Sequence, residues 1–277
     1  MLGLFDEPIP AAPPVIGEEE IDAAVRVLRG SGGGSGGVQA AESAAFEEEF
    51  AELVSGRYCV AVDSGVSALR LTLTALGIGA GDEVVVPSFA FAATADAVRL
   101  AGAEPVFADI RPDSFCLDPD AAAAAIGPRT AALLPVHLYG HPAAMDRLLP
   151  LAARHGLAVV EDACQAHGAS LHGRPVGSFG TAGCFSFHPA RTTHSLAGGM
   201  VSTADPELAR TLRRLRGGGT AGPASPAGPA VTAGGRAYEG LGADLRMTAV
   251  AAAVGREQLK KLPGWTARRR ANGAGSR

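Results

Sequence analysis

The feature that most constrains this 277-residue chain is a regular alternation of short apolar runs and amphipathic stretches from Tyr58 onward. Strands this apolar are buried on both faces, and their alternation with helices is typical of a parallel sheet that is covered on both sides. The pattern therefore predicts an α/β fold. The five predicted strands of this region span residues 58–62, 83–87, 104–109, 131–136 and 158–162.

Further elements flank this region on both sides. Two amphipathic helices are predicted ahead of it, one over residues 18–30 and one with Phe46 and Phe50 on its apolar face. Two more strands, at 182–187 and 198–203, are close enough in the sequence to pair as a hairpin-like return. The sheet is therefore expected to be mainly parallel.

Composition divides the chain into four segments. The run SGGGSGG at 31–37 is predicted to be either a flexible linker or a loop that closes over a ligand. The small residues of 217–237 have almost nothing to bury, which predicts a mobile loop. A final helix is expected to end at Pro263. The segments are an N-terminal helix with its glycine-rich loop, a large α/β domain, a flexible loop and a terminal helix, at residues 1–40, 41–216, 217–237 and 238–277.

The bulk composition argues against several classes of function. A formal net charge of −4 gives no electrostatic case for nucleic acid as a partner. No apolar run approaches the roughly 20 residues that span a bilayer, and the N-terminus lacks the pattern of a signal peptide, so a cytoplasmic protein is expected. The cysteines have no CxxC spacing, which indicates neither a zinc site nor a disulfide framework. They are Cys59, Cys116, Cys164 and Cys184.

Candidate site residues follow the predicted strands, because ligands in open α/β sheets bind at the carboxyl ends of strands. The turn at 63–67 opens a helix, where backbone N–H groups and the Ser67 hydroxyl would bind an anion. After the second strand, either Phe89 or Phe91 could stack on a planar ligand, although an aromatic residue in this position is more often part of the core. The fifth strand ends in Asp162, whose carboxylate suits a pyridinium N–H or a helix N-cap.

Two adjoining segments carry a resemblance to a known family. They read VEDACQAHGA at 160–169 and GRPVGSFGTAGCFSFHPARTTHSLAGGMVST at 173–203. Both resemble the DegT/DnrJ/StrS-type sugar aminotransferases, which depend on pyridoxal 5′-phosphate (PLP), and the resemblance extends over residues 10–270. It implies the large domain of the fold type I PLP-transferase group, with a mainly parallel seven-stranded sheet and helices on both faces.

The resemblance also implies roles for matching positions. Asp162 would pair with the pyridine nitrogen of PLP, or of its amine form pyridoxamine 5′-phosphate (PMP), and keep the ring an electron sink. Gln165 would lie near the ring hydroxyl, Phe91 would stack on the ring, and His188 would line the pocket. The phosphate would be held by Gly65, Ser67 and Ser186.

One position breaks the pattern decisively. The family places its Schiff-base lysine three residues after His188, and this chain has Arg191 there; its only lysines are Lys260 and Lys261. A guanidinium stays protonated and has no useful lone pair, so it can neither bond the cofactor aldehyde nor transfer the proton. We therefore expect no covalent link to the cofactor and no ordinary transamination; loss of a general base alone is worth roughly 10²–10⁴ in rate.

Other positions depart from the family in the same direction. Val66 and Ala90 stand where the family prefers threonine, and its GEGG segment is reduced to LAGG at 196–199. Asp244 replaces an asparagine that the family offers to the phosphate across the dimer, and a carboxylate facing a phosphate is repulsive. The small C-terminal domain of the family is expected to be largely missing, a pattern that a truncated chain, a frameshifted gene or a short paralogue would each produce.

Three functional hypotheses follow from these observations. The first is an inactive or PLP-binding-deficient relative, such as an accessory partner of an intact paralogue. The second is a PMP-dependent sugar dehydratase-like enzyme in which His188 or His194 acts as the base. The third is a working aminotransferase, which no lysine of this chain readily supports. The resemblance implies a nucleotide-linked keto sugar as substrate, glutamate or glutamine as amino donor, and a homodimer, or a heterodimer with an intact paralogue.

Overall fold

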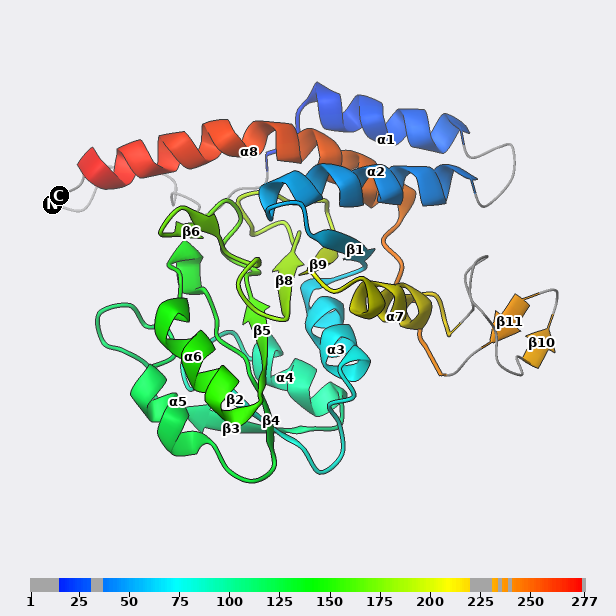
Figure 1. The fold of residues 1–277 in the computed structure, drawn as a ribbon. Coiled ribbons are helices and arrows are strands. Elements are labelled where there is room, and N and C mark those ends of the chain that lie inside the picture. Colours follow the sequence, from blue (N-terminus) through cyan, green and yellow to red (C-terminus); the bar gives the residue numbers. More distant parts are fainter. Residues whose placement is uncertain (1–14, 31–36, 220–230, 234–235, 239–240, 276–277) are drawn as a thin grey trace, which may run out of the picture.

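The computed structural model describes residues 15–30, 37–219, 231–233, 236–238 and 241–275 (Figure 1). At its centre is a seven-stranded sheet in the order β1-β9-β8-β5-β4-β2-β3. Of these strands, β9 runs antiparallel to both of its neighbours, and the others form a parallel set. This confirms the predicted mainly parallel sheet and its hairpin-like return. The strands are β1 (Tyr58–Val62), β2 (Glu83–Pro87), β3 (Glu104–Ala108), β4 (Thr130–Leu133), β5 (Ala158–Asp162), β8 (Ala182–Ser186) and β9 (Gly199–Thr203).

Helices bury both faces of the sheet, as its apolar strands require. In β1, Val60 and Val62 belong to the core that α3 shares, whereas Cys59 and Ala61 belong to a second core with Phe46 of α2. All residues of β8 and β9 are buried. The helices are α1 (Glu18–Gly30), α2 (Gly37–Leu53), α3 (Gly65–Ala75), α4 (Ala93–Leu100), α5 (Pro119–Ala125), α6 (Met145–His155), α7 (Pro206–Arg216) and α8 (Ala249–Gly275).

The predicted end of the last helix at Pro263 is wrong, because α8 continues to Gly275. A proline inside a helix removes one backbone hydrogen bond and crowds the preceding turn. Packing on either side of it outweighs that loss. Leu262 is buried, and both Leu262 and Thr266 lie against Gly168 in the segment after β5. Figure 1 shows α8 lying across α1 and α2, at one end of the molecule.

β1 is an edge strand, and polar side chains cover its free edge. Glu47 of α2 accepts a hydrogen bond from the Ala61 N–H at 2.9 Å. From α7, Arg213 donates to the Cys59 carbonyl at 2.9 Å and Arg216 donates to the Ala61 carbonyl at 2.7 Å. Both arginines also pair with Glu47, at 3.3 and 2.6 Å. The edge therefore presents few free backbone groups to another strand.

Several predicted segments differ from the structure or lie outside it. The strands predicted at 104–109 and 131–136 end earlier, and Val136 instead makes an isolated bridge with Asp162. Residues 31–36, 220–230 and 234–235 lie outside the described residues, so the two loop predictions are placed only in part. Within the second loop, β10 (Val231–Ala233) pairs with β11 (Arg236–Tyr238). A further short pair is β6 (Ser170–Leu171) with β7 (Arg174–Pro175). In the described part of the chain, no helix combines the length and the hydropathy that crossing a membrane requires.

Candidate functional site

A pocket of about 600 Å³ opens where β1, β2, β5 and β8 end. This is the edge at which an open parallel sheet binds its ligands. Its wall is made of the segments 63–66 after β1, 89–94 after β2, 162–165 after β5 and 186–191 after β8, together with Leu138, Tyr139, Ala197 and Gly198. Seven of the eight predicted site residues line it, and Ser67 does not. Those that line it are Gly65, Phe91, Asp162, Gln165, Ser186, His188 and Arg191.

The first turn of α3 forms one wall of the pocket. Ser64 is its N-cap, and the Ser64 Oγ accepts from the Ser67 N–H at 3.1 Å and bonds to the Ser67 Oγ at 2.9 Å. Ser67 is thus used within the turn, whereas the N–H groups of Gly65 and Val66 have no partner among the described residues. A Cβ at Gly65 would lie 2.6 Å from the Ser186 Cβ. Glycine therefore lets the positive end of α3 approach β8.

Asp162 lies at the bottom of the pocket, where hydrogen bonds fix its carboxylate. The side chain is 5% exposed. Its Oδ2 accepts from the Thr94 hydroxyl at 2.7 Å, and its Oδ1 accepts from the Cys164 N–H at 3.1 Å. Thr94 was not among the predicted site residues, because nothing in its local sequence indicates a contact with Asp162. The orientation of Asp162 is set before any ligand binds.

Glu161, the preceding residue, is completely buried and anchors the β5 end from behind. Its two oxygens accept from the backbone N–H groups of Gly177, Phe179 and Gly180 at 2.7–2.8 Å. The His137 Nδ1 accepts from a backbone N–H, so the proton is on Nε2, which donates to Glu161 at 3.0 Å. Burial alone would raise the pKa of Glu161, but these donors outweigh it and the pKa is lowered.

Gln165, Tyr139 and Phe91 complete the wall near Asp162. The Gln165 Oε1 accepts from the Tyr139 N–H at 3.1 Å, which leaves the amide NH₂ as a donor to the pocket. Tyr139 has a φ of 51° and its side chain is largely exposed, so this bond holds a strained backbone position beside the pocket. The Phe91 side chain is 67% exposed at the pocket mouth, where a planar ligand would cover it.

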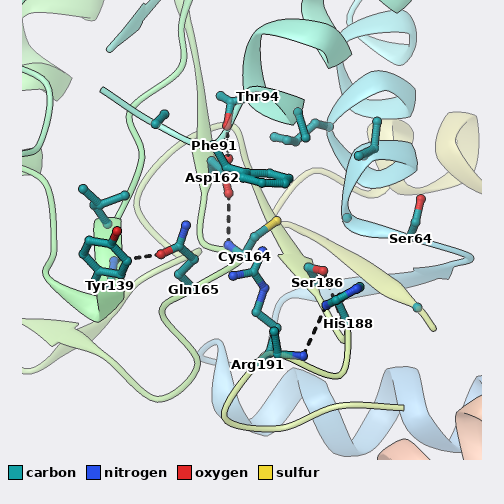
Figure 2. A pocket seen from close by; sticks show the side chains of 18 of the residues that line it. Ser64, Phe91, Thr94, Tyr139, Asp162, Cys164, Gln165, Ser186, His188 and Arg191 are labelled. Carbon is teal, nitrogen blue, oxygen red and sulfur yellow. Dashed lines mark hydrogen bonds between the residues drawn. The ribbon is translucent and has the colours of Figure 1, made fainter. Parts of the chain in front are cut away.

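Arg191 projects into the pocket from a tight turn after β8. The Arg191 N–H donates to the His188 carbonyl at 2.9 Å, and the His188 Nδ1 accepts from the Ala190 N–H at 3.2 Å. Figure 2 shows the Arg191 side chain directed toward Cys164 and Gln165. Its Nε is buried without a hydrogen-bond partner, and no described carboxylate forms an ion pair with it. This guanidinium therefore faces the pocket with unused donors.

Two further groups beside Arg191 have perturbed pKa values. Burial raises the pKa of the Cys164 thiol well above its ordinary range, so Cys164 is a neutral wall residue. Burial, with a smaller contribution from the Arg191 charge, lowers the pKa of His167 to about 3. His167 packs against Phe185 and Phe187 at ring-centroid distances of 5.6 and 5.3 Å. It is therefore a neutral residue of the core beneath the pocket.

The remaining basic and acidic candidates lie elsewhere. The Lys260 Nζ pairs with Glu257 at 2.8 Å, and the Lys261 Nζ pairs with Glu20 at 2.7 Å, both on α8 and away from the pocket wall. Asp244 pairs with Arg246 at 2.7 Å, which lowers the pKa of Asp244 to about 2. Its predicted place opposite a partner's phosphate stays a prediction. In the part of the chain that the structure describes, no cluster of metal-binding side chains occurs.

The sequence matches the DegT/DnrJ/EryC1/StrS aminotransferase family over residues 14–275. The chain belongs to this family. It is 46% identical over 227 residues to the dTDP-3-amino-3,4,6-trideoxy-alpha-D-glucose transaminase of Streptomyces venezuelae, covering 82% of this chain and 57% of that one. The chain spans between about half and two thirds of the length of the curated relatives it matches.

Solved structures of aminotransferases have the same fold. The aminotransferase from Psychrobacter cryohalolentis matches with a TM-score of 0.87 and 38% identity, covering 96% of this chain and 67% of that one. The sugar aminotransferase Spr1654 from Streptococcus pneumoniae, in its PLP form, matches with a TM-score of 0.82 and 27% identity, covering 93% and 68%. The α/β sheet predicted for a PLP-transferase fold is thereby confirmed.

Proposed function

We propose that this DegT/DnrJ/EryC1/StrS-family chain binds a PLP-type cofactor without a covalent bond and does not itself transaminate. The observation that carries the proposal is the place of Arg191. It lies on the pocket wall that also holds Asp162, while both lysines are ion-paired on α8. The chain therefore has a pocket suited to the cofactor but offers it no primary amine.

The residues present fit the non-reacting parts of PLP or PMP. The open N–H groups of Gly65 and Val66 at the start of α3 would receive the phosphate, with Ser186 close by. The fixed carboxylate of Asp162 would accept from the pyridinium N–H. Phe91 would cover the ring, and the Gln165 amide would donate to the ring oxygen. When bound, the cofactor supplies an electron sink for chemistry at carbon–nitrogen bonds.

The dehydratase alternative has weaker support from the pocket. It requires a base, and the His188 Nδ1 already accepts from the Ala190 N–H, so a neutral His188 carries its proton on Nε2 and faces a ligand as a donor. His194, the other candidate base, is buried and does not line the pocket. An accessory role beside an intact paralogue follows from the same loss of the amine. A nucleotide sugar would be the ligand of any assembled site, because the similar transaminase of Streptomyces venezuelae is named for a dTDP-sugar.

The test is reduction with borohydride in the presence of PLP. Wild-type protein should yield no pyridoxyl adduct by peptide mass spectrometry, and dialysis should remove the bound PLP. Arg191→Lys should yield an adduct at residue 191, because the lysine amine can lose its proton in a partly buried site. Arg191→Met is the matched control without an amine. An adduct at Lys260 or Lys261 in wild-type protein, or turnover of an amino donor by it, would overturn the proposal.

A further inference from the structure

The pocket wall around Arg191 consists of hydrogen-bond donors. The Arg191 Nε is buried without a partner, and its guanidinium has no ion pair within the described residues. The Gln165 amide NH₂ is free to donate while the Gln165 Oε1 is bonded to Tyr139. The Nε2 of a neutral His188 is also a donor, because its Nδ1 accepts from Ala190. A ligand group that reaches this wall meets donors and a positive charge.

Negative charge in the pocket is concentrated elsewhere. Asp162 directs its carboxylate to the bottom of the pocket, where Thr94 and the Cys164 N–H already bond to both of its oxygens. Asp63, the other carboxylate on the wall, is exposed at the turn before α3, and it accepts from the Ser64 hydroxyl at 3.3 Å. No carboxylate among the described residues therefore neutralises the guanidinium of Arg191. A guanidinium that lines a pocket without an ion pair suits an acceptor, here one that a ligand brings.

The chemistry of the ligand follows from this arrangement and rests on the proposed function. In a pyridoxal-type ring, the carbon that bears the 4′ group lies opposite the ring nitrogen. The same carbon lies between the ring oxygen and the arm that carries the phosphate. If Asp162 holds the nitrogen, Gln165 the ring oxygen and the start of α3 the phosphate, the 4′ group would face the Arg191 side chain, which is directed toward Gln165 (Figure 2). An amine at 4′ is a protonated cation at neutral pH and would meet a guanidinium, whereas an oxygen at 4′ would accept from it.

We propose that Arg191 makes this pocket select a ring phosphate whose 4′ group is an oxygen acceptor, with a carboxylate best, and reject PMP. Arginine suits a carboxylate because its planar fork can donate two parallel hydrogen bonds. The guanidinium that stands in place of a nucleophilic amine thus gives the pocket a preference for oxygen acceptors. The ligand class is an oxidised or aldehyde-form pyridoxal phosphate, held without any bond formed or broken.

The experiment is isothermal titration of the wild-type chain with four probes. They are PLP, PMP, 4-pyridoxic acid 5′-phosphate and 4-deoxypyridoxine 5′-phosphate, whose 4′ groups are an aldehyde, an amine, a carboxylate and a neutral methyl. We expect the carboxylate probe to bind at least tenfold more tightly than the methyl probe and PMP at least tenfold more weakly. Because each comparison is a ratio within one protein, partial unfolding does not distort it.

Two variants assign the preference to the guanidinium. Arg191→Met should bring the ratio of carboxylate to PMP affinity close to one or reverse it, and Arg191→Gln, which keeps donors without charge, should give an intermediate ratio. Arg210→Met, which removes an exposed arginine on α7, should leave the wild-type ratio unchanged. These variants read binding alone and need no turnover.

The outcomes separate the two proposals. If all four probes bind but PMP binds as tightly as the carboxylate probe, the selection by Arg191 is overturned while the proposed cofactor pocket stands. If Arg191→Met keeps the wild-type ratio, the preference has another source and the inference is wrong. If no probe binds at millimolar concentration, the proposed function is overturned, and the inference fails with it.

Discussion

The two sides of the pocket differ in how completely their polar groups are satisfied. At the β5 end, Asp162 and Glu161 are buried, and each carboxylate oxygen accepts at least one hydrogen bond. In the connection between β8 and β9, the Arg191 Nε and the Thr193 Oγ1 are buried without a partner among the described residues. Leu196 of the same connection has a φ of 69°, a region that disfavours leucine.

This difference shows which parts of the site the fold supports by itself. The β5 end is part of the sheet, so its carboxylates are oriented by backbone groups that folding fixes in any case. The β8–β9 connection lies outside the strands and contains buried polar groups without a partner among the described residues, which cost free energy. Arg191 therefore lies on the side of the pocket whose buried polar groups the described residues leave unsatisfied.

Removing the charge of Glu161 should disrupt the β5 end of the pocket, where each carboxylate oxygen is hydrogen-bonded. Of the changes considered, it should lower stability most. In Glu161→Gln, one oxygen becomes an NH₂ group that faces two donors, so we expect the free energy of unfolding to fall by about 3–5 kcal/mol. Urea denaturation followed by circular dichroism measures this. Glu83→Gln, which weakens a surface pair with Arg129, should lose less than about 1 kcal/mol. Similar losses in both variants would contradict the anchoring role of Glu161.

Acid should destabilise the core beneath Arg191, because His167 is buried there in its neutral form. The pKa of His167 is lowered in the folded protein to about 3, from 6.5, so the unfolded chain binds the proton first as the pH falls. The stability is complete above pH 6.5 and is lost as the pH falls toward 3, by about 1.4 kcal/mol per unit. Between pH 6.5 and 5, wild type should lose about 2 kcal/mol more than His167→Gln. His155→Gln, at an exposed site on α6, should keep the wild-type slope; a shared slope in wild type and His167→Gln would refute the assignment.

Relieving the backbone strain at Leu196 should change stability least. It tests whether the β8–β9 connection is strained where the β5 end is not. Leu196 is 51% exposed, so its side chain contributes little burial, and glycine adopts its positive φ without steric cost. Leu196→Gly should raise the free energy of unfolding by about 0.5 kcal/mol or less, which a slightly higher melting temperature would show. Leu100→Gly, at an exposed helical position, should lower stability by about 1 kcal/mol. A destabilised Leu196→Gly would show that the leucine makes contacts worth more than the strain.

Much of the fold and of the pocket wall could be predicted from local sequence. The strand ends could be predicted because a short apolar run stops at a polar residue, as at Asp162. The sheet then brings such ends together. The place of Arg191 could be predicted because its register is fixed by the preceding strand. Thr94 could not, since its role depends on a hydroxyl meeting Asp162 from another strand end. The end of α8 was missed because contacts of Leu262 and Thr266 with Gly168, distant in sequence, outweigh a local proline signal.

The pairing of β1 with β9 also has a consequence for how the chain folds as it is made. β1 pairs with a strand that begins at Gly199, and the arginines that cover its other edge come still later, at 213 and 216. During synthesis, β1 would thus remain an unpaired apolar strand until most of the domain has been made. Contacts this distant in sequence slow folding and lengthen the time in which such a strand can aggregate. The strand at 58–62 is therefore a segment that a chaperone acting during translation would protect.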